Sequence, residues 1–263
     1  MFDPELWLIG LAPILALAVA TWGVSVAKRD VSIVDSLWSL LLLGAAFAYA
    51  LAHGQTLPRT TLVLTLVTVW ALRLAVHITV RGWGEPEDRR YRAIRARNEP
   101  GFRWKSLYLV FGLQGLLAWT ISLPLLGALT GTAPLGWLDA VGIALWLIGF
   151  LFETIADWQL HRFRANPANR TRVLDTGLWR HTRHPNYFGE FLVWWGFFLI
   201  ALSAGGWWSV ASPLLVSILL LRVSGVSLLE QDIAQRRPAS REYVRRTNAF
   251  LPGPRRGPAE QSG

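Results

Sequence analysis

The fold is decided first by residues 6–27, which read LWLIGLAPILALAVATWGVSVA. A helix needs about 20 apolar residues to cross the hydrocarbon core of a bilayer, and this segment supplies them without one charged residue. Its N-terminal flank carries Asp3 and Glu5 instead of Lys or Arg, which is unlike a cleaved signal peptide. We therefore expect the segment to remain in the mature protein as its first membrane span.

Segments of the same kind recur along the chain. They lie near residues 31–52, 61–80, 106–130, 135–157, 188–205 and 207–229. Hydrophobic residues make up 52% of the 263 residues and charged residues only 16%, a composition typical of a polytopic membrane protein. The sequence therefore predicts an all-α integral membrane protein, a bundle of about seven transmembrane helices.

The basic residues predict how the chain is oriented. Of the 26 Lys and Arg residues, 23 fall in segments that seven spans would place on one side, and only Arg59 falls on the other. The positive-inside rule then gives an outside N-terminus and a cytoplasmic C-terminus. We expect a multi-pass protein, of the inner membrane if the host is bacterial, with its active site facing the cytoplasm. Residues 1–251 are expected to form one domain, and residues 252–263, rich in Pro, Gly and Arg, a flexible basic tail.

The net charge of +9 comes almost wholly from arginine, with 24 Arg to 2 Lys. Guanidinium groups suit phosphate recognition and contact with anionic lipid headgroups. We expect no nucleic-acid partner, because the basic residues lie in short segments between apolar spans and not on a solvated basic fold. With no cysteine, disulfides, thiol catalysis and Cys-ligated metals are excluded. No metal site is expected at His181 and His184, because the flanking arginines would repel a cation.

Ionisable residues occur inside the predicted spans, where each costs several kcal/mol and marks a candidate site. Arg73, His77 and Arg81 recur every four residues and so share one helix face. Asp35 lies about one turn inside the second span. Further candidates lie at or just beyond the end of the fifth span, at the start of the sixth and at the end of the seventh: Glu153, Asp157, His161, Arg164, Glu190 and Glu230.

These polar groups admit structural explanations as well as functional ones. Arg73 and its neighbours could pair with Glu153 and Asp157, and Asp35 could simply favour a helix N-terminus. We favour the functional explanation, because five spans and the long loops 81–105 and 158–187 bring their polar groups to the same depth in the membrane. The sequence therefore predicts a polar pocket that opens to the cytoplasm.

Residues 177–190, GLWRHTRHPNYFGE, form the densest polar stretch and precede an apolar segment. The chain has no Gly-x-Gly-x-x-Gly sequence after a strand, no phosphate-binding loop of the Walker type and no His-Glu-x-x-His sequence. An arginine-rich pocket suits a phosphorylated cofactor. Asn186 and the carboxylates would then hold neutral donors such as hydroxyl groups.

Together the motifs resemble a known family. They are DSLW at residues 35–38, RGWGEPEDRRY at 81–91, Glu153-x-x-x-Asp157, the stretch 177–190 and Glu230. The chain looks like the DUF1295 group of membrane proteins, which is similar to the steroid 5α-reductases and more distantly to sterol C14- and Δ7-type reductases. The core RHPNY at 183–187 is also similar to membrane methyltransferases that modify isoprenylcysteine carboxyls.

The resemblance implies an oxidoreductase that uses NADPH to reduce a carbon–carbon double bond conjugated to a ketone. Its substrate would be a lipophilic enone that enters from the bilayer, such as a 3-oxo-4-ene steroid. The residues that would hold the cofactor are Arg81, Asp88, Arg90, Tyr91, Asp157, Arg164, Arg180, Arg183, His184, Asn186, Tyr187 and Glu190. Two alternatives remain, a methyltransferase that binds S-adenosylmethionine and a lipid-binding or transport protein without chemistry.

The catalytic residues depart from the pattern of the resembled enzymes, in which a Glu on the second helix and a Tyr on the third polarise the substrate carbonyl. Here the nearest acid on the second helix is Asp35, and the nearest titratable group on the third is His77. Either a protonated Asp35 donates the proton, or Asp35 orients His77 and the imidazolium donates it. Trp38 and Arg73, on the same two helices, are expected to contact the substrate.

Overall fold

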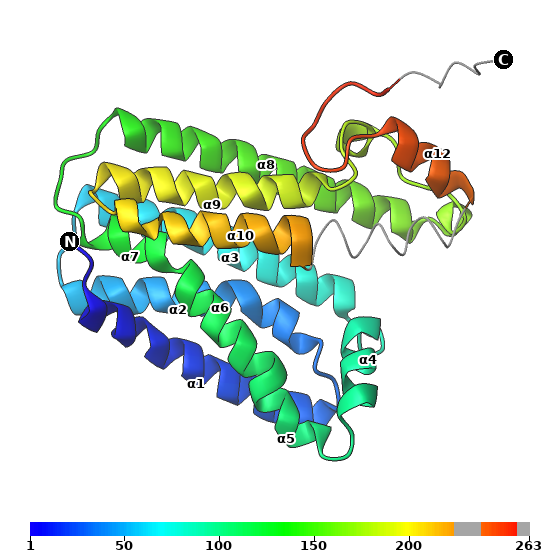
Figure 1. The fold of residues 1–263 in the computed structure, drawn as a ribbon, viewed down its shortest axis with the longest axis horizontal. Coiled ribbons are helices and arrows are strands. Elements are labelled where there is room, and N and C mark those ends of the chain that lie inside the picture. The colour runs from blue at the N-terminus through cyan, green and yellow to red at the C-terminus, as the bar shows by residue number, and fades with distance from the viewer. Residues whose placement is uncertain (224–237, 257–263) are drawn as a thin grey trace. The chain divides into compact units, whose positions relative to one another are not determined.

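The structure, a computed structural model, describes residues 1–223 and 238–256 (Figure 1). Over these residues the chain is helical, and the β-structure consists of one isolated bridge between Thr182 and Asn248. The elements are α1 (Pro4–Lys28), α2 (Ile33–His53), α3 (Pro58–Gly82), α4 (Arg89–Asn98), α5 (Phe102–Ser106), the π-helix η1 (Leu107–Gly112), α6 (Leu113–Ile121), α7 (Leu123–Thr130), α8 (Trp137–Ala165), η2 (Pro167–Asn169), η3 (Gly177–Arg180), α9 (Pro185–Ser203), η4 (Trp207–Val210), α10 (Ala211–Ile218), η5 (Leu219–Val223) and α12 (Pro238–Arg246). The predicted all-α class is confirmed.

Five helical segments in the described part of the chain are long and apolar enough to cross a membrane. They are α1, α2, α3, the run Phe102–Thr130 and α8. This supports the multi-pass membrane protein that the sequence predicts. The count of seven and the orientation of the termini stay predictions. The last predicted span, 207–229, lies partly outside the described residues, and Glu230 lies outside them altogether.

Local sequence explains where the first helices begin and end. Asp3 caps α1 by accepting a hydrogen bond from the backbone N–H of Leu6 at 3.0 Å, and proline opens both α1 and α3, where a missing N–H costs nothing. Gly54 closes α2 with φ at 70°, a backbone conformation that glycine adopts without strain. These signals fix the lengths of the first spans.

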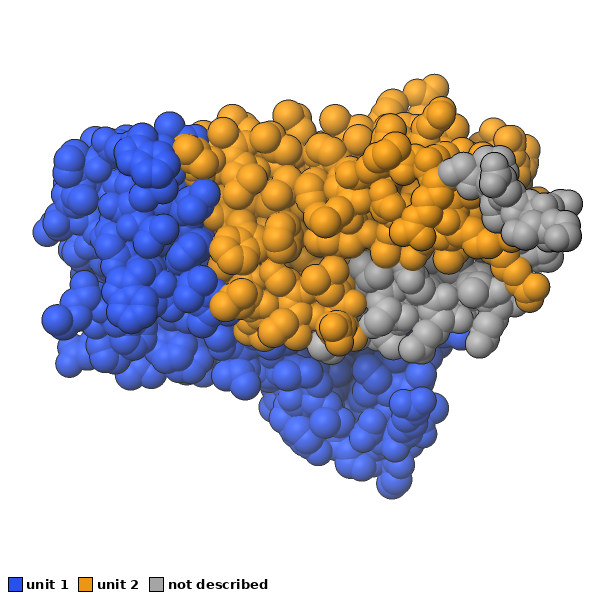
Figure 2. Space-filling model, turned by 45° about the horizontal axis from the view of Figure 1, so that its top comes forward, with its two compact units in different colours: residues 1–140, 197–212 blue, residues 141–196, 213–263 orange. Residues whose placement is uncertain are grey.

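The chain forms two compact units, which Figure 2 distinguishes by colour. Unit 1 comprises residues 1–140 and 197–212, and unit 2 comprises residues 141–196 and 213–263. Helices α8 and α9 contribute residues to both units. The expectation of a single domain over residues 1–251 stays a prediction.

Helix α2 is the central helix of unit 1, because it contacts α1, α3, α6 and α7. Leu41, Leu42, Ala45 and Ala46 on this helix are fully buried. Because α2 packs against four other helices, the position of a polar residue in its first turn is fixed. That residue is Asp35.

A hydrophobic cluster joins α4 to the helices of unit 1. Tyr91 of α4 is buried with Val31, Val34 and Phe102, and Ile94 packs against the same cluster. Helix α4 is therefore held against the turn between α1 and α2. Figure 1 shows α4 next to the end of α3.

A second polar feature of unit 1 is an ion pair between Arg59, at the start of α3, and Asp139, in the first turn of α8. Both side chains are 2% exposed, and the two are joined by two hydrogen bonds of 2.9 and 2.8 Å. Arg59 also donates to the carbonyl oxygens of Ala133 and Pro134, and Asp139 accepts from Ser203 and from the backbone of Gly136. This ion pair therefore has hydrogen-bond partners on both sides, as a buried pair requires.

Candidate functional site

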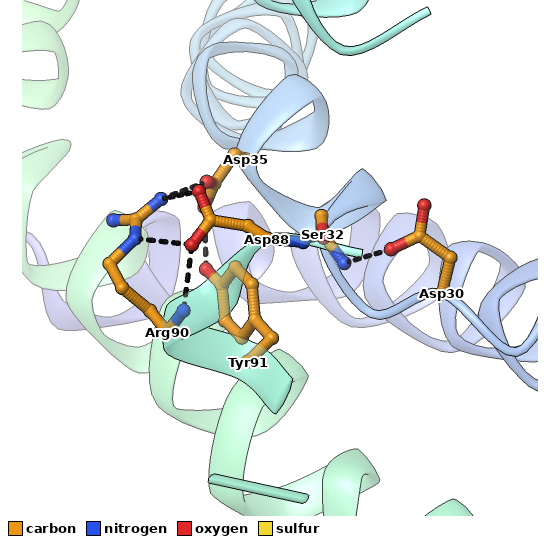
Figure 3. Close-up of polar contacts among 6 residues, drawn as sticks. All are labelled: Asp30, Ser32, Asp35, Asp88, Arg90 and Tyr91. Carbon is orange, nitrogen blue, oxygen red and sulfur yellow. Dashed lines mark hydrogen bonds and ion pairs between the residues drawn. The ribbon is translucent and has the colours of Figure 1, made fainter. Parts of the chain in front are cut away.

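Asp35 is the acceptor at the centre of a polar cluster in unit 1 (Figure 3). The Tyr91 hydroxyl donates to Asp35 Oδ1 at 2.5 Å, and Arg90 Nη2 donates to Asp35 Oδ2 at 2.8 Å. Both donors come from the first turn of α4. The carboxylate thus has a neutral donor on one oxygen and a cation on the other. Its side chain is 19% exposed and that of Arg90 is 58% exposed, so the cluster is open to solvent on the Arg90 side.

Asp88 positions the two donors. As the N-cap of α4, Asp88 accepts a hydrogen bond from the backbone N–H of Arg90 at 2.8 Å and another from Arg90 Nε at 3.0 Å. Its own N–H donates to Ser32 Oγ at 2.6 Å, and the N–H of Ser32 donates to Asp30 at 2.8 Å (Figure 3). The start of α4 is therefore fixed to the residues that precede α2. We call Asp35, Asp88, Arg90 and Tyr91 the α2–α4 cluster.

Glu87 provides a second attachment beside this cluster. Its carboxylate accepts from the backbone N–H of Val31 at 2.9 Å and from the guanidinium of Arg95 at 2.7 and 3.0 Å. The guanidinium of Arg95 also lies over the ring of Phe102. Glu87 therefore links α4 to the turn before α2 a second time, next to the α2–α4 cluster.

The electrostatics of the cluster favour the neutral phenol of Tyr91 and the charged forms of Asp88 and Arg90. Burial, and then the neighbouring Asp35 carboxylate, raise the pKa of Tyr91 above its usual value, so the hydroxyl stays a donor. Burial alone would raise the pKa of Asp88, but its hydrogen bonds with Arg90 lower it. Burial works against the charge of Arg90, yet Asp88 and Asp35 raise its pKa. A phenol beside a carboxylate and a permanent cation results.

The remaining predicted residues of unit 1 lie on α2 and α3. Arg73, His77 and Arg81 all belong to α3, so they share one face as their spacing predicts, and Trp38 follows Asp35 by one turn on α2. The sequence suggests that Asp35 could orient His77. In the structure the two oxygens of Asp35 accept hydrogen bonds from Arg90 and Tyr91, which the sequence does not predict. Catalytic and substrate roles for Asp35, His77, Trp38 and Arg73 stay predictions. The same holds for the cofactor roles of Arg81, Asp88, Arg90 and Tyr91.

In unit 2 the helices α8 and α9 approach each other closely through glycines. A Cβ atom added to Gly149 would lie 2.6 Å from the backbone oxygen of Gly189, and one added to Gly196 would lie 2.8 Å from that of Gly142. The two glycines of each helix are seven residues apart, so they fall on one face. Because only glycine allows this backbone contact, the side chains next to it on the two helices are brought together.

Those neighbouring side chains include three predicted cofactor residues, Asp157, Asn186 and Glu190, and also Glu153, which lies beside Gly189. Asn186 donates to Asp157 Oδ1 at 3.4 Å, and Glu190 accepts from the indole N–H of Trp194 at 2.9 Å. Glu153 and Asp157 are buried, with 4% and 5% of their surface exposed. The structure therefore brings together the acids of one predicted motif and the amide of the other. We call Glu153, Asp157, Asn186 and Glu190 the α8–α9 face.

The loop before α9 is held by the end of the chain. Tyr243 Oη donates to the carbonyl oxygen of Trp179 at 2.7 Å, Thr182 Oγ1 donates to that of Phe250 at 2.8 Å, and the N–H of Gly253 donates to that of His181 at 3.1 Å. Arg255 forms an ion pair with Asp175 at 2.9 Å. Residues 253–256 are thus hydrogen-bonded to other residues of unit 2. The rest of the predicted flexible tail, residues 257–263, lies outside the described residues.

Arg183 has hydrogen bonds to this terminal segment. Its Nη1 donates to the carbonyl oxygens of Val244 and Thr247, both at 2.6 Å. His184 is buried and stacks on Tyr187, with 5.6 Å between ring centroids, whereas Arg164 and Arg180 are exposed. Contacts of these five residues with a cofactor stay predictions, and Arg183 has a clear part in holding the loop.

Sequence reasoning missed Tyr243 and the glycine contact. Tyr243 lies on α12, and burial raises its pKa above the usual value, which keeps its hydroxyl a donor to Trp179. No local pattern marks Tyr243, since its partner is 64 residues away. The glycine contact did have a signal, because Gly142 and Gly149, like Gly189 and Gly196, are separated by seven residues in apolar helices.

Comparison with known proteins identifies the family. A family described as "Protein of unknown function (DUF1295)" matches residues 21–247, most of the chain. The chain belongs to this family. An uncharacterised protein of Schizosaccharomyces pombe is 26% identical over 286 residues, which cover 95% of this chain and 81% of that protein.

A steroid enzyme is similar over a shorter stretch. The 3-oxo-5-alpha-steroid 4-dehydrogenase 1 of Bos taurus is 36% identical over 66 residues, which cover 25% of this DUF1295 chain and 26% of the bovine enzyme. The chain therefore resembles this bovine enzyme over about a quarter of either length. No solved structure matches the chain.

Proposed function

We propose that this DUF1295 protein is an NADPH-dependent reductase of the carbon–carbon double bond of a lipophilic enone, such as a 3-oxo-4-ene steroid. The observation that carries the proposal is the hydrogen bond between Tyr91 and Asp35 in the first turn of α2. It supplies an acid and a phenol, the two groups that polarise a carbonyl in the enzymes that the chain resembles. The partial similarity to a bovine steroid dehydrogenase supports the same assignment.

The residues of unit 2 fit a phosphorylated dinucleotide. Arg164 and Arg180 are exposed and offer guanidinium groups for phosphate oxygens. The α8–α9 face offers an amide and carboxylates, which can bind the amide and hydroxyl groups of a nucleotide. NADPH, when bound, would supply the hydride that adds to the β-carbon of the enone.

The α2–α4 cluster would supply the proton. Beside an ionised Asp35 the raised pKa of Tyr91 makes the phenol a weak acid, so Tyr91 needs its proton replaced as it gives one away. In the structure Tyr91 donates to Asp35, so this step requires that Asp35 first take a proton from water and that the 2.5 Å hydrogen bond reverse; Asp35 would then pass its proton to Tyr91 Oη while Tyr91 protonates the carbonyl oxygen of the substrate. The resulting enol then returns to the ketone.

Arg90 and solvent would complete the cycle. Once Asp35 has lost its proton, Arg90 at 2.8 Å stabilises the carboxylate. Asp35 is 19% exposed, so a new proton can reach it from water. Two hydrogens are thereby added to the enone, one as a hydride and one as a proton, and one NADPH is oxidised.

The proposal is tested on the full chain purified in a mild detergent. We expect saturable binding of NADPH and oxidation of NADPH only after an enone is added. Asn186→Ala should weaken NADPH binding about tenfold, because one polar partner of the cofactor is removed. Gln55→Ala, at an exposed amide of the loop between α2 and α3, is the matched control.

Two results would contradict the proposal. Saturable binding of S-adenosylmethionine, without binding of NADPH, would favour the methyltransferase alternative. Stabilisation by lipophilic ligands alone, with no NADPH oxidation by any enone, would favour a lipid-binding protein.

A further inference from the structure

Helix α8 carries an exposed apolar stripe on the side away from the α8–α9 face. Leu147, Ile148, Leu151, Ile155 and Trp158 are each at least 40% exposed. Their spacings of one, three and four residues keep them on one side of the helix. Since α8 is long and apolar enough to cross a membrane, this stripe suits contact with lipid chains.

A pocket of about 310 Å³ lies where this stripe reaches the polar end of α8. Trp158, Arg162 and Phe163 line it from α8, and Asn166, Asn169 and Thr176 line it from the segment that follows α8. The lining includes one cation and no acidic residue. An anionic group is the ligand that such a lining favours.

The pocket is distinct from the proposed cofactor site. Arg162 follows Asp157 by five residues on α8, which at 3.6 residues per turn places it about 140° around the helix. Asp157 belongs to the α8–α9 face, whereas Arg162 lines the pocket. A ligand in the pocket would therefore occupy a different side of α8.

The walls of the pocket are fixed by hydrogen bonds. Asn166 Oδ1 accepts from the N–H of Ala168 at 3.0 Å, which leaves its amide group as a donor, and Asn169 Nδ2 donates to the carbonyl oxygen of Phe163 at 2.9 Å. Gln159 accepts from the N–H of Leu178 at 3.1 Å. Gly177 makes this wall possible, because it has a φ of 58° and a Cβ atom there would lie 2.3 Å from Gln159 Nε2.

Arg162 and Trp158 are placed as an interfacial pair. The guanidinium carbon of Arg162 lies 5.5 Å from the ring centroid of Trp158, within the range of a cation–π contact. Tryptophan is enriched where hydrocarbon meets water. The pair thus presents a charge on the polar side and an apolar ring on the side of the stripe.

We propose that this pocket binds the phosphate headgroup of an anionic phospholipid whose acyl chains lie along the exposed stripe of α8. Arg162 neutralises the phosphate, Asn166 donates to its oxygens or to the glycerol, and Trp158 covers the junction with the chains. The stripe and the pocket are continuous at Trp158, which belongs to both. That continuity is what a single amphipathic ligand requires.

The test uses the full chain in a neutral detergent and native mass spectrometry with phosphatidylglycerol and phosphatidylcholine of equal chain length. We expect one tightly bound phosphatidylglycerol per chain and weaker binding of phosphatidylcholine. Arg162→Gln should weaken phosphatidylglycerol binding about fivefold, because one basic group near the headgroup is lost. Arg162→Lys keeps the charge and should lose less. Arg241→Gln, at an exposed arginine of α12, is the matched control and should leave the tight site unchanged.

Two outcomes would overturn the proposal. One is equal weakening by Arg162→Gln and Arg241→Gln, which would mean that the positive charge of the whole chain attracts the lipid. The other is binding of glycerol phosphate as tight as that of phosphatidylglycerol, which would mean that the ligand is a soluble phosphate and that the stripe plays no part. Neither outcome depends on NADPH or on turnover.

Discussion

Two of the carboxylate–arginine pairs in the described part of unit 1 differ in what surrounds them. Arg59 and Asp139 are each 2% exposed and are joined by two hydrogen bonds. Arg90 and Asp35 are 58% and 19% exposed, and the second oxygen of Asp35 accepts from a phenol. The same two charges are thus enclosed in one place and accessible in the other.

The difference in exposure indicates which pair stabilises the fold and which pair can take part in a reaction. A buried pair is retained only if every polar atom around it finds a partner, and backbone carbonyls and Ser203 provide them for Arg59 and Asp139. An accessible pair contributes little to stability, but it can exchange partners with a substrate. We therefore assign the Arg59–Asp139 pair to the fold and propose that the α2–α4 cluster serves the function, and the predictions below test this division.

The largest effect on stability is expected from Arg59→Met. This variant leaves the Asp139 carboxylate buried without its cation, which costs about 3–5 kcal/mol in the free energy of unfolding. The matched variant Arg90→Met should cost less than about 1 kcal/mol, because an exposed pair is screened by water. Thermal unfolding of both variants in the same detergent measures the difference. Equal losses would remove the distinction between the two pairs.

The largest effect on activity is expected from Tyr91→Phe. The ring stays in its hydrophobic cluster and the hydroxyl is lost, so turnover should fall about 10²–10⁴-fold, the range for loss of a general acid. Stability should change by only about 1 kcal/mol, and NADPH binding should weaken far less than turnover. His77→Gln is the companion variant. If it abolishes turnover while Tyr91→Phe does not, the proton comes from His77 and the α2–α4 cluster is structural.

A smaller effect is expected from pH, with opposite signs for the two kinds of group. The pKa values of Glu87 and Asp88 are lowered, for Glu87 by Arg95 and Val31 against the effect of burial. Between the lowered folded values and the unfolded values of about 4 the unfolded chain binds more protons, so this stabilisation is present above about pH 4 and lost below it. The pKa of Tyr91 is raised, chiefly by burial, so its contribution is present below about pH 10 and lost above it.

Hydrogen exchange of the α4 amides across this pH range checks the prediction. Protection of α4 should decrease at both ends of the range, and Tyr91→Phe should abolish only the alkaline decrease. Protection that does not vary with pH would show that the hydrophobic cluster alone holds α4.

Several features of the fold could be predicted from the sequence because their causes are local. The uncharged run at residues 6–27 predicts α1, proline marks the starts of α3 and α9, and the four-residue spacing of Arg73, His77 and Arg81 predicts their shared face. The motif residues Asp157 and Asn186 were expected in one site, and they are hydrogen-bonded to each other.

Other features depend on contacts that no local pattern specifies. Asp35 and Tyr91 are 56 residues apart in sequence. They meet because Tyr91 and Ile94 of α4 pack into the hydrophobic cluster that includes Val31, Val34 and Phe102. The residues after Pro252 have the composition of a loose tail, yet Arg255 pairs with Asp175, 80 residues away. In both cases long-range packing, and not propensity, decides the position of the polar group.

The most direct test of the central claim is the transfer of deuterium from NADPH that is labelled at its hydride-donating carbon. The purified chain is incubated with the labelled NADPH and an enone, and the product is analysed by mass spectrometry. The account predicts one deuterium at the β-carbon of the saturated ketone, and much less product from Tyr91→Phe. A product without deuterium, or no reduction of any enone by a chain that binds S-adenosylmethionine, would contradict it.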